Sequence, residues 1–462
     1  MAQAAHSQPR AVSRPNIVVI ISDQFRGDMI GAAGRNPMGL TPNLDRMARR
    51  GTMFQSAVCN QPVCAPTRAC IFTGQYPERH GVWRNAIAIK PDAKTLATAC
   101  RDAGYSANYI GKWHLGPPGP RGDHSSAVTG PVPAEYRGGF LNLWEAANEL
   151  EWSSHPYEGD LYDADQRPMH FSGVYRTDFM TQRAENFFRN ARNAHNPFLL
   201  VLSYLEVHHQ NDIDAFVPPK EYAGRYKNPF VPQDLRPLPG SWGEQLGDYC
   251  ACVAKMDETV GTLLKSLEDN LLSDNTIVLF VSDHGCHFKT RNTEYKRSPH
   301  ESSIHVPLIV QGPGFNRGIT IPEIVSHVDI APSLLAAAGI PVPGTMQGKS
   351  FVPLLDRKTD GWRNEAYITM SEYTTGRILR TPEWTYAVAV PKMPGWKQEQ
   401  SSPQYNEYMM YDLAADPFQH VNMAGRVQSR AAAEGLKKRL LARIEEASGE
   451  KSNIGPVLFP YS

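Results

Sequence analysis

Short runs of apolar residues alternate with amphipathic stretches through the first three quarters of the chain. The runs NIVVIIS (16–22), PFLLVLSYLEV (197–207) and NTIVLFVSD (275–283) are rich in β-branched residues and lack polar alternation. Such runs are typical of strands buried on both faces of a parallel sheet. Apolar residues recur at helical spacing between them, and the longest such stretch covers 247–271. The alternation predicts an α/β fold with a large, mostly parallel sheet sandwiched by helices.

Local signals refine the expected elements. Thr41 precedes Pro42, so we expect a helix that begins at Pro42, with Thr41 as its N-cap and Gly51 at its end. Further helices are expected near 96–103 and 179–192, and a strand near 107–111.

Two segments, 117–169 and 211–243, are rich in Gly, Pro and aromatic residues and read as long loops, which commonly carry function. After about Leu355 short strands with turn signals precede a final helix near 430–447. We therefore divide the chain into a disordered N-terminal arm (1–14), a catalytic domain (15–355) and a small α+β C-terminal domain (356–462).

Charge and composition narrow the classes of protein. The 462 residues include 47 basic and 47 acidic side chains, so a bulk polycation that binds nucleic acid is excluded. No apolar run reaches the length of a membrane span. The first 16 residues have no apolar core and are not a secretory signal. They are either a disordered arm, which leaves the chain cytoplasmic, or the remnant of a removed signal, which makes it periplasmic or secreted.

The seven cysteines do not form a disulfide scaffold or a zinc site. Their number is odd, and none of their spacings is that of a zinc site. Cys250 and Cys252 lie in an apolar helical pattern and are expected to be buried thiols.

Two apolar runs end in the same way, VVIISD at Asp23 and VLFVSD at Asp283. In open α/β sheets, ligands bind beyond the carboxyl ends of the strands. If the two strands are neighbours, Asp23 and Asp283, followed by Gln24 and His284, would form a cation site. An Asp after a strand also caps turns, so the residues alone leave both interpretations open.

The segment PVCAPTRACIFTG (62–74) puts Cys64 at the expected start of a helix, just before Pro66. The N–H groups and dipole of a helix N-terminus favour negative charge, and Arg68 adds a planar fork of donors. This position suits a nucleophile that acts on an anionic group.

The same segment, read as C-x-P-x-R followed by T-G, resembles the motif of the formylglycine-dependent type I sulfatases of the alkaline phosphatase superfamily. Other segments also resemble this family: GYSANYIGKWHLG (104–116), SYLEVHHQ (203–210), VSDHG (281–285), KRSPHESSIHVPLIVQGPG (296–314) and YDLAADPFQHVNMA (411–424). The resemblance covers about 15–425 and implies an alkaline phosphatase-like fold.

The resemblance also implies a chemistry for Cys64. In this family a formylglycine-generating enzyme or a radical maturase oxidises the cysteine to an aldehyde, which hydrates to a geminal diol. One hydroxyl attacks sulfur and displaces the alcohol of a sulfate monoester. The other then loses its proton, sulfate leaves, and the aldehyde is restored. A serine has only one hydroxyl and therefore lacks this exit.

Roles follow by position within the matching segments. Asp23, Gln24, Asp283 and His284 are the implied metal ligands, and Arg68 stabilises the formylglycine. By the same resemblance, Lys112 and Lys296 would hold sulfate oxygens. His114 would take the diol proton, and His208 would be the general acid at the leaving oxygen. As substrate-pocket groups the sequence offers a weaker set with no motif of its own: His209, Trp152, His155, His287 and His300.

Two departures from the family pattern keep alternatives open. Many sulfatases have Asp-Asp and Asp-Asn where this chain has Asp23-Gln24 and Asp283-His284. We expect calcium, which prefers oxygen ligands, but the imidazole also admits manganese or zinc. Similar pairs occur in formylglycine-dependent phosphonate monoester and phosphodiester hydrolases, the alternative to a carbohydrate sulfatase. A noncatalytic glycan-binding protein is the third hypothesis, and the complete catalytic set argues against it.

Overall fold

The computed structural model describes residues 14–117, 129–391 and 397–457. The predicted N-terminal arm, apart from Arg14, lies outside the described residues. None of the described helices is both long and apolar enough to cross a membrane.

The main sheet has eleven strands in the order β11-β2-β10-β9-β1-β8-β3-β4-β6-β5, with β7 paired to β6. The five strands from β9 to β4 are parallel to one another, and antiparallel pairs flank them on both sides. The predicted fold class is therefore confirmed. The strand bounds are β1 (Asn16–Ser22), β2 (Thr52–Val58), β3 (Ser106–Lys112), β4 (Trp144–Ala147), β5 (Ser154–His155), β6 (Glu158–Tyr162), β7 (Pro168–Ser172), β8 (Phe198–Ser203), β9 (Thr276–Ser282), β10 (Leu308–Gln311) and β11 (Ile319–Ser326).

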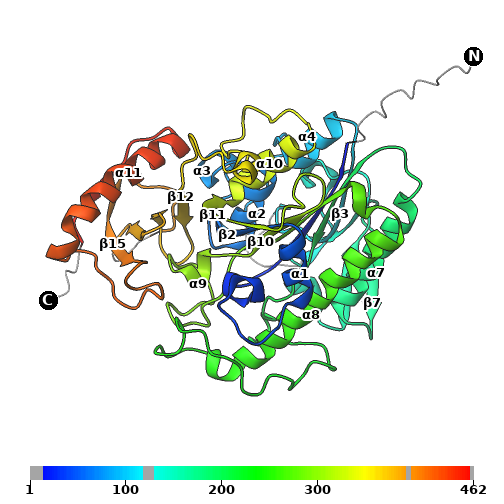
Figure 1. Cartoon of the computed structure of the whole chain (residues 1–462), viewed down its shortest axis with the longest axis horizontal. Helices are drawn as coiled ribbons and strands as arrows, with labels where there is room; N and C mark the ends of the chain where they lie inside the picture. The colour runs from blue at the N-terminus through cyan, green and yellow to red at the C-terminus, as the bar shows by residue number, and fades with distance from the viewer. Residues whose placement is uncertain (1–13, 118–128, 392–396, 458–462) are drawn as a thin grey trace, which may run out of the picture.

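Helices cover both faces of this sheet, as Figure 1 shows. Alternate residues of β1 point to opposite faces: Val19 packs in one core cluster with α2, α4 and α10, and Val18 in another with α1, α7 and α8. A strand buried on both sides needs an unbroken apolar run, which is the pattern seen in the sequence. The helix bounds are α1 (Pro42–Arg50), α2 (Cys64–Thr73), α3 (Pro77–His80), α4 (Leu96–Asp102), α6 (Leu150–Ser153), α7 (Arg176–Ala191), α8 (Trp242–Asp269), α9 (Glu301–Ile304), α10 (Ile330–Ala337) and α11 (Arg430–Ser448).

A second, five-stranded sheet lies at one end of the molecule, beside α11 (Figure 1). Its strands are β12 (Ala366–Met370), β13 (Gly376–Arg380), β14 (Trp384–Ala389), β15 (Gln404–Asp412) and β16 (Asn453–Gly455). Leu440 of α11 packs in one cluster with Tyr386 of β14. Another cluster joins Val58 of the main sheet to Ile368 of the small one. The boundary near 355 therefore stays a prediction.

The loop expected over 117–169 is more regular than its sequence indicated. Within it β4, α6, β5 and β6 extend the edge of the main sheet. These elements are two to five residues long, too short for a periodic pattern. The strands are stabilised by successive pairing at the sheet edge: β4 pairs with β3, β6 with β4, and β5 with β6. Part of this loop, 118–128, lies outside the described residues.

All seven cysteines are buried free thiols, as expected for Cys250 and Cys252.

Candidate active site

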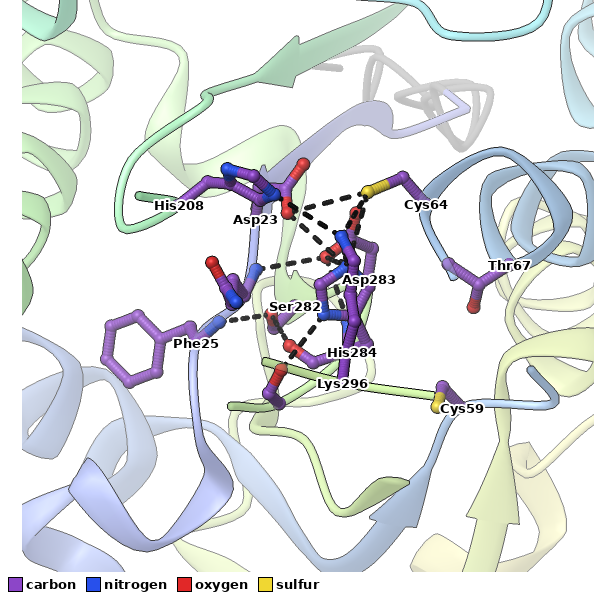
Figure 2. Close-up of polar contacts among 12 residues, drawn as sticks. Asp23, Phe25, Cys59, Cys64, Thr67, His208, Ser282, Asp283, His284 and Lys296 are labelled. Carbon is purple, nitrogen blue, oxygen red and sulfur yellow. Dashed lines mark hydrogen bonds and ion pairs between the residues drawn. The ribbon is translucent and has the colours of Figure 1, made fainter. Parts of the chain in front are cut away.

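The candidate site forms where the central parallel strands end (Figure 2). Strands β1 and β9 are neighbours in register, with Ser22 opposite Ser282. The next residues, Asp23 and Asp283, therefore emerge side by side, and both are fully buried. The condition set by the sequence for a cation site, adjacent strands, is met.

Arg68 joins the two carboxylates from the second turn of α2. Its guanidinium donates to Oδ2 of Asp23 at 3.1 Å and to Oδ2 of Asp283 at 3.0 Å. A further donor reaches the Ser203 hydroxyl at 2.6 Å. Burial alone disfavours the charged form, but the two carboxylates raise the pKa of Arg68 above its usual value. The arginine is thus a fixed cation at the base of the site.

Cys64 is the first residue of α2 and faces three chemical groups. Its Sγ lies 2.9 Å from Nζ of Lys296, 3.3 Å from Nε2 of His284 and 3.9 Å from Oδ1 of Asp23. Burial raises the pKa of this thiol, yet the Lys112 and Lys296 ammonium groups bring it well below the usual value.

The other cysteines differ from Cys64 in this respect. Burial raises the pKa of each of them: Cys59, Cys70, Cys100, Cys250, Cys252 and Cys286. Among the seven cysteines, only Cys64 has surroundings that favour the thiolate.

The donor atoms around Cys64 fit a divalent cation. One ligand atom from each of Asp23, Cys64, Asp283 and His284 lies within 4.8 Å of the others. Nδ1 of His284 lies 3.0 Å from the Gly285 carbonyl. If Nδ1 carries the proton and donates to this carbonyl, Nε2 has a free lone pair that faces the other ligand atoms of the cluster.

Gln24, the residue after Asp23, is the fourth expected ligand. Its backbone has a φ of 64°, and its Oε1 accepts from the His209 backbone N–H at 3.2 Å. Its Nε2 is buried without a hydrogen-bond partner among the described residues. His209 therefore fixes the carboxamide oxygen of Gln24.

Lys112 ends β3 and bridges two carboxylates, with Nζ 2.8 Å from both Asp23 Oδ2 and Glu151 Oε1. His114 lies two residues on, with Nε2 3.6 Å from Glu149 and Nδ1 3.8 Å from Glu151. Burial opposes ionisation of Glu151, but Lys112 and His114 lower its pKa to about 2. The two glutamates surround the lysine and histidine with negative charge.

Sequence reasoning missed Glu149 and Glu151. They lie in the segment read as an irregular loop, and no motif includes them. The only available signal was a pair of acids separated by one apolar residue, in NELEW (148–152).

His208 completes the cluster. Its Nε2 lies 3.3 Å from Nζ of Lys296, and its Nδ1 is 2.6 Å from the His209 carbonyl. The His209 ring stacks between His208 and Tyr295 and reaches Oε1 of Gln24 at 3.1 Å. His209 thus fixes the position of the His208 ring and of the Gln24 carboxamide.

The remaining predicted substrate residues differ in their surroundings. Trp152 is 41 % exposed, and the exposed His155 lies 3.5 Å from Asp212. His300 is buried between Ser298 and the Tyr411 hydroxyl, and burial lowers its pKa. Nε2 of the buried His287 lies 3.0 Å from the Lys296 carbonyl, so this ring supports the lysine loop.

The fold and the cluster together define an α/β protein with candidate cation ligands at its strand ends and a cysteine of lowered pKa at the start of α2. A family model described as Sulfatase matches residues 15–340. A second model, described as N-sulphoglucosamine sulphohydrolase, C-terminal, matches 293–446. The chain belongs to the sulfatase family, whose members hydrolyse sulfate esters and typically use a metal and formylglycine.

Individual relatives agree with this assignment. An ulvan-active sulfatase of Formosa agariphila is 30% identical, covering 95% of this chain and 82% of that protein. An N-acetylglucosamine-6-O-sulfatase of Bacteroides thetaiotaomicron is 26% identical, covering 99% and 90%.

Solved structures share the fold. A sulfatase structure from Bacteroides fragilis superimposes with a TM-score of 0.78 at 25% identity, covering 96% of this chain and 97% of that one. A phosphonate monoester hydrolase of Agrobacterium radiobacter has a TM-score of 0.68 at 22% identity, covering 94% and 96%, a likeness of fold alone.

Proposed function

We propose that this sulfatase hydrolyses a sulfate monoester of a carbohydrate, with formylglycine made from Cys64 as its nucleophile. The observation that carries the proposal is the surroundings of Cys64: a buried helix-start cysteine 2.9 Å from a lysine ammonium, within a cluster of two aspartates and a histidine. A separate maturase, either a formylglycine-generating enzyme or a radical maturase, is the partner required to produce the aldehyde.

Asp23, Gln24, Asp283 and His284 would hold the cation. We propose calcium, since carboxylates provide most of the charge, and the His284 imidazole makes manganese or zinc the alternatives. A bound cation supplies positive charge that draws electron density from the sulfate and favours the ionised diol. Arg68 links the two aspartates and fixes the spacing of the ligands.

The three sulfate oxygens need fixed positive charge on the side facing Cys64. Lys296 lies 2.9 Å from Sγ of Cys64 and Lys112 lies 2.8 Å from Asp23, so the two ammonium groups flank the cysteine. In the transition state for attack on sulfur, these groups would stabilise the charge that develops on the oxygens.

His208 would protonate the departing alcohol. If Nδ1 donates to the His209 carbonyl at 2.6 Å, the neutral ring has an Nε2 lone pair that faces Lys296, and a proton taken up at Nε2 can be passed to the leaving oxygen. Breaking the S–O bond of the ester then gives a neutral alcohol rather than an alkoxide.

His114 would act in the second half of the reaction. The remaining diol hydroxyl gives its proton to His114, the C–O bond to sulfate breaks, and the aldehyde returns. Glu149 and Glu151, at 3.6 and 3.8 Å from the ring, would stabilise the imidazolium that forms.

The carbohydrate part of the proposal rests on the relatives. The names of the two curated relatives and of the C-terminal family model point to ulvan or to a sulfated amino sugar. Family membership favours sulfate over the phosphonate alternative, to which the chain has only a likeness of fold.

A matched pair of 4-nitrophenyl esters, one a sulfate and one a phenylphosphonate, tests the reaction with protein produced alongside a maturase. We expect a higher kcat/KM for the sulfate, and no turnover of either ester by Cys64→Ala, since the diol is then absent. A higher kcat/KM for the phosphonate would overturn the proposal in favour of the alternative. Full activity of Cys64→Ala would overturn the proposed nucleophile.

A further inference from the structure

A hollow of about 330 Å³ lies beside the Cys64 cluster. This volume falls at the lower end of the range of about 300–1,000 Å³ usual for small-ligand sites. The residues that line it are Arg84, Asn85, Ala86, Glu294, Arg297, Glu372, Tyr373 and Gln398.

Two links tie this hollow to the reacting residue. Oδ1 of Asn85 accepts from the backbone N–H of Ala65, the residue after Cys64, at 3.1 Å. Arg297 directly follows Lys296, whose ammonium group lies 2.9 Å from Sγ of Cys64. The wall of the hollow is therefore fixed to the residue after Cys64, and its Arg297 directly follows the lysine that faces Cys64.

Most of the charge in the hollow is already paired. Arg297 donates to Glu294 at 2.7 Å and also to Glu372. The other carboxylate oxygen of Glu372 accepts from the Asn85 backbone N–H at 2.6 Å. Arg297 and Glu372 thus stabilise the wall of the hollow, and each has its charge largely balanced by its partner.

Arg84 is different. Its guanidinium lies 5.5 Å from the centre of the Trp83 ring, and its hydrogen bond is a long one, 3.4 Å to the Asn85 carbonyl. No carboxylate of the described residues forms an ion pair with it, although two carboxylates line the same hollow. The ring limits where the half-buried side chain can lie, and its planar fork of donors suits an oxyanion.

We propose that this hollow binds a second oxyanion of the sulfated saccharide, with Arg84 as the residue that selects for it. This inference rests on the proposed function, because it assumes that a sulfate ester lies at Cys64. The second oxyanion is either the carboxylate of a uronic acid or another sulfate group. Both offer oxygens to the two outer nitrogens of a guanidinium.

Binding to the full-length Cys64→Ala chain, measured by calorimetry, tests this without any turnover. One pair of probes is N-acetylglucosamine 6-sulfate and glucosamine 2-N,6-O-disulfate, which tests a second sulfate. The other pair is glucose 2-sulfate and glucuronic acid 2-sulfate, which tests a carboxylate. We expect the doubly anionic member of one pair to bind about ten-fold more tightly than its partner, and that pair identifies the source.

Adding Arg84→Gln to this chain should remove the ten-fold ratio, because the amide keeps a polar end but loses the charge. The matched control is Arg101→Gln, an exposed arginine on α4, which should keep the ratio. A ratio that survives Arg84→Gln, or no preference in either pair, overturns the inference.

The proposed function can fail separately. If mature wild-type protein does not hydrolyse 4-nitrophenyl sulfate, the proposed reaction is wrong, whereas the binding ratios still decide the role of Arg84.

Discussion

At the scale of single residues, each buried carboxylate of the site balances the charge of a neighbouring cation. Asp23 accepts hydrogen bonds from both Arg68 and Lys112, whereas burial and the Cys64 charge oppose its ionisation. Lys112, with the other cations, nevertheless holds the pKa of Asp23 below its usual value. Glu151 is the second carboxylate on Lys112, and through it the lysine can stay in place when a cation occupies Asp23.

Replacing Glu151 with Gln tests this role. The amide keeps the shape but removes one of the two charges that fix Lys112, at a cost typical of a hydrogen bond to a charged group. We expect kcat/KM for 4-nitrophenyl sulfate to fall by roughly 10–100-fold. Glu158→Gln, an exposed change in β6, should leave kcat/KM within error. Equal values for Glu151→Gln and wild type would show that Asp23 alone suffices for Lys112.

The elements differ in how far the sequence could predict them. The long apolar runs that became β1, β8 and β9 could be predicted because burial on both faces needs an unbroken pattern. The short strands β4 to β6 could not, because their stability comes from pairing at the sheet edge. Glu149 and Glu151, the two carboxylates near His114, lie in that edge region. The motifs therefore indicated His114 but not the two carboxylates beside it.

The ion pair between Glu301 and Arg380 is among those that join the main body to the small sheet. Arg380 of β13 donates to both carboxylate oxygens of Glu301 in α9, at 3.0 and 3.1 Å. Burial raises the pKa of Glu301, but Arg380 lowers it to about 2, from an ordinary value of 4.5. Because the folded-state pKa is the lower one, this pair stabilises the fold above about pH 4.5, and the contribution is lost as the pH falls toward 2.

Glu301→Gln should therefore lower the free energy of unfolding at pH 7 by roughly 1–3 kcal/mol. The difference from wild type should narrow as the pH falls below about 4.5, since the wild-type carboxyl then becomes neutral as well. Urea denaturation at several pH values measures this, with the exposed Glu268→Gln as control. A difference that is constant with pH would mean that shape, not charge, holds α9 to β13.

At the scale of the whole molecule, the fold brings together residues that lie up to 273 positions apart, from Asp23 to Lys296. The strand ends provide Asp23, Lys112 and Asp283, and α2 provides both Cys64 and Arg68. The sequence motifs indicated which chemical groups form the site. The distances between these groups could not be predicted, because they depend on the order of the strands in the sheet. The hollow at Arg84 could not be predicted either, because its walls come from four segments that share no motif.

Peptide mass spectrometry of the segment that contains Cys64 tests the central claim most directly. The protein should be produced together with a formylglycine-generating enzyme, and the Cys64→Ala chain gives the reference peptide. The account predicts that the thiol is lost and replaced by an aldehyde, in a fraction of molecules that tracks sulfatase activity. Turnover of sulfate esters by protein whose Cys64 is entirely an unmodified thiol would contradict it.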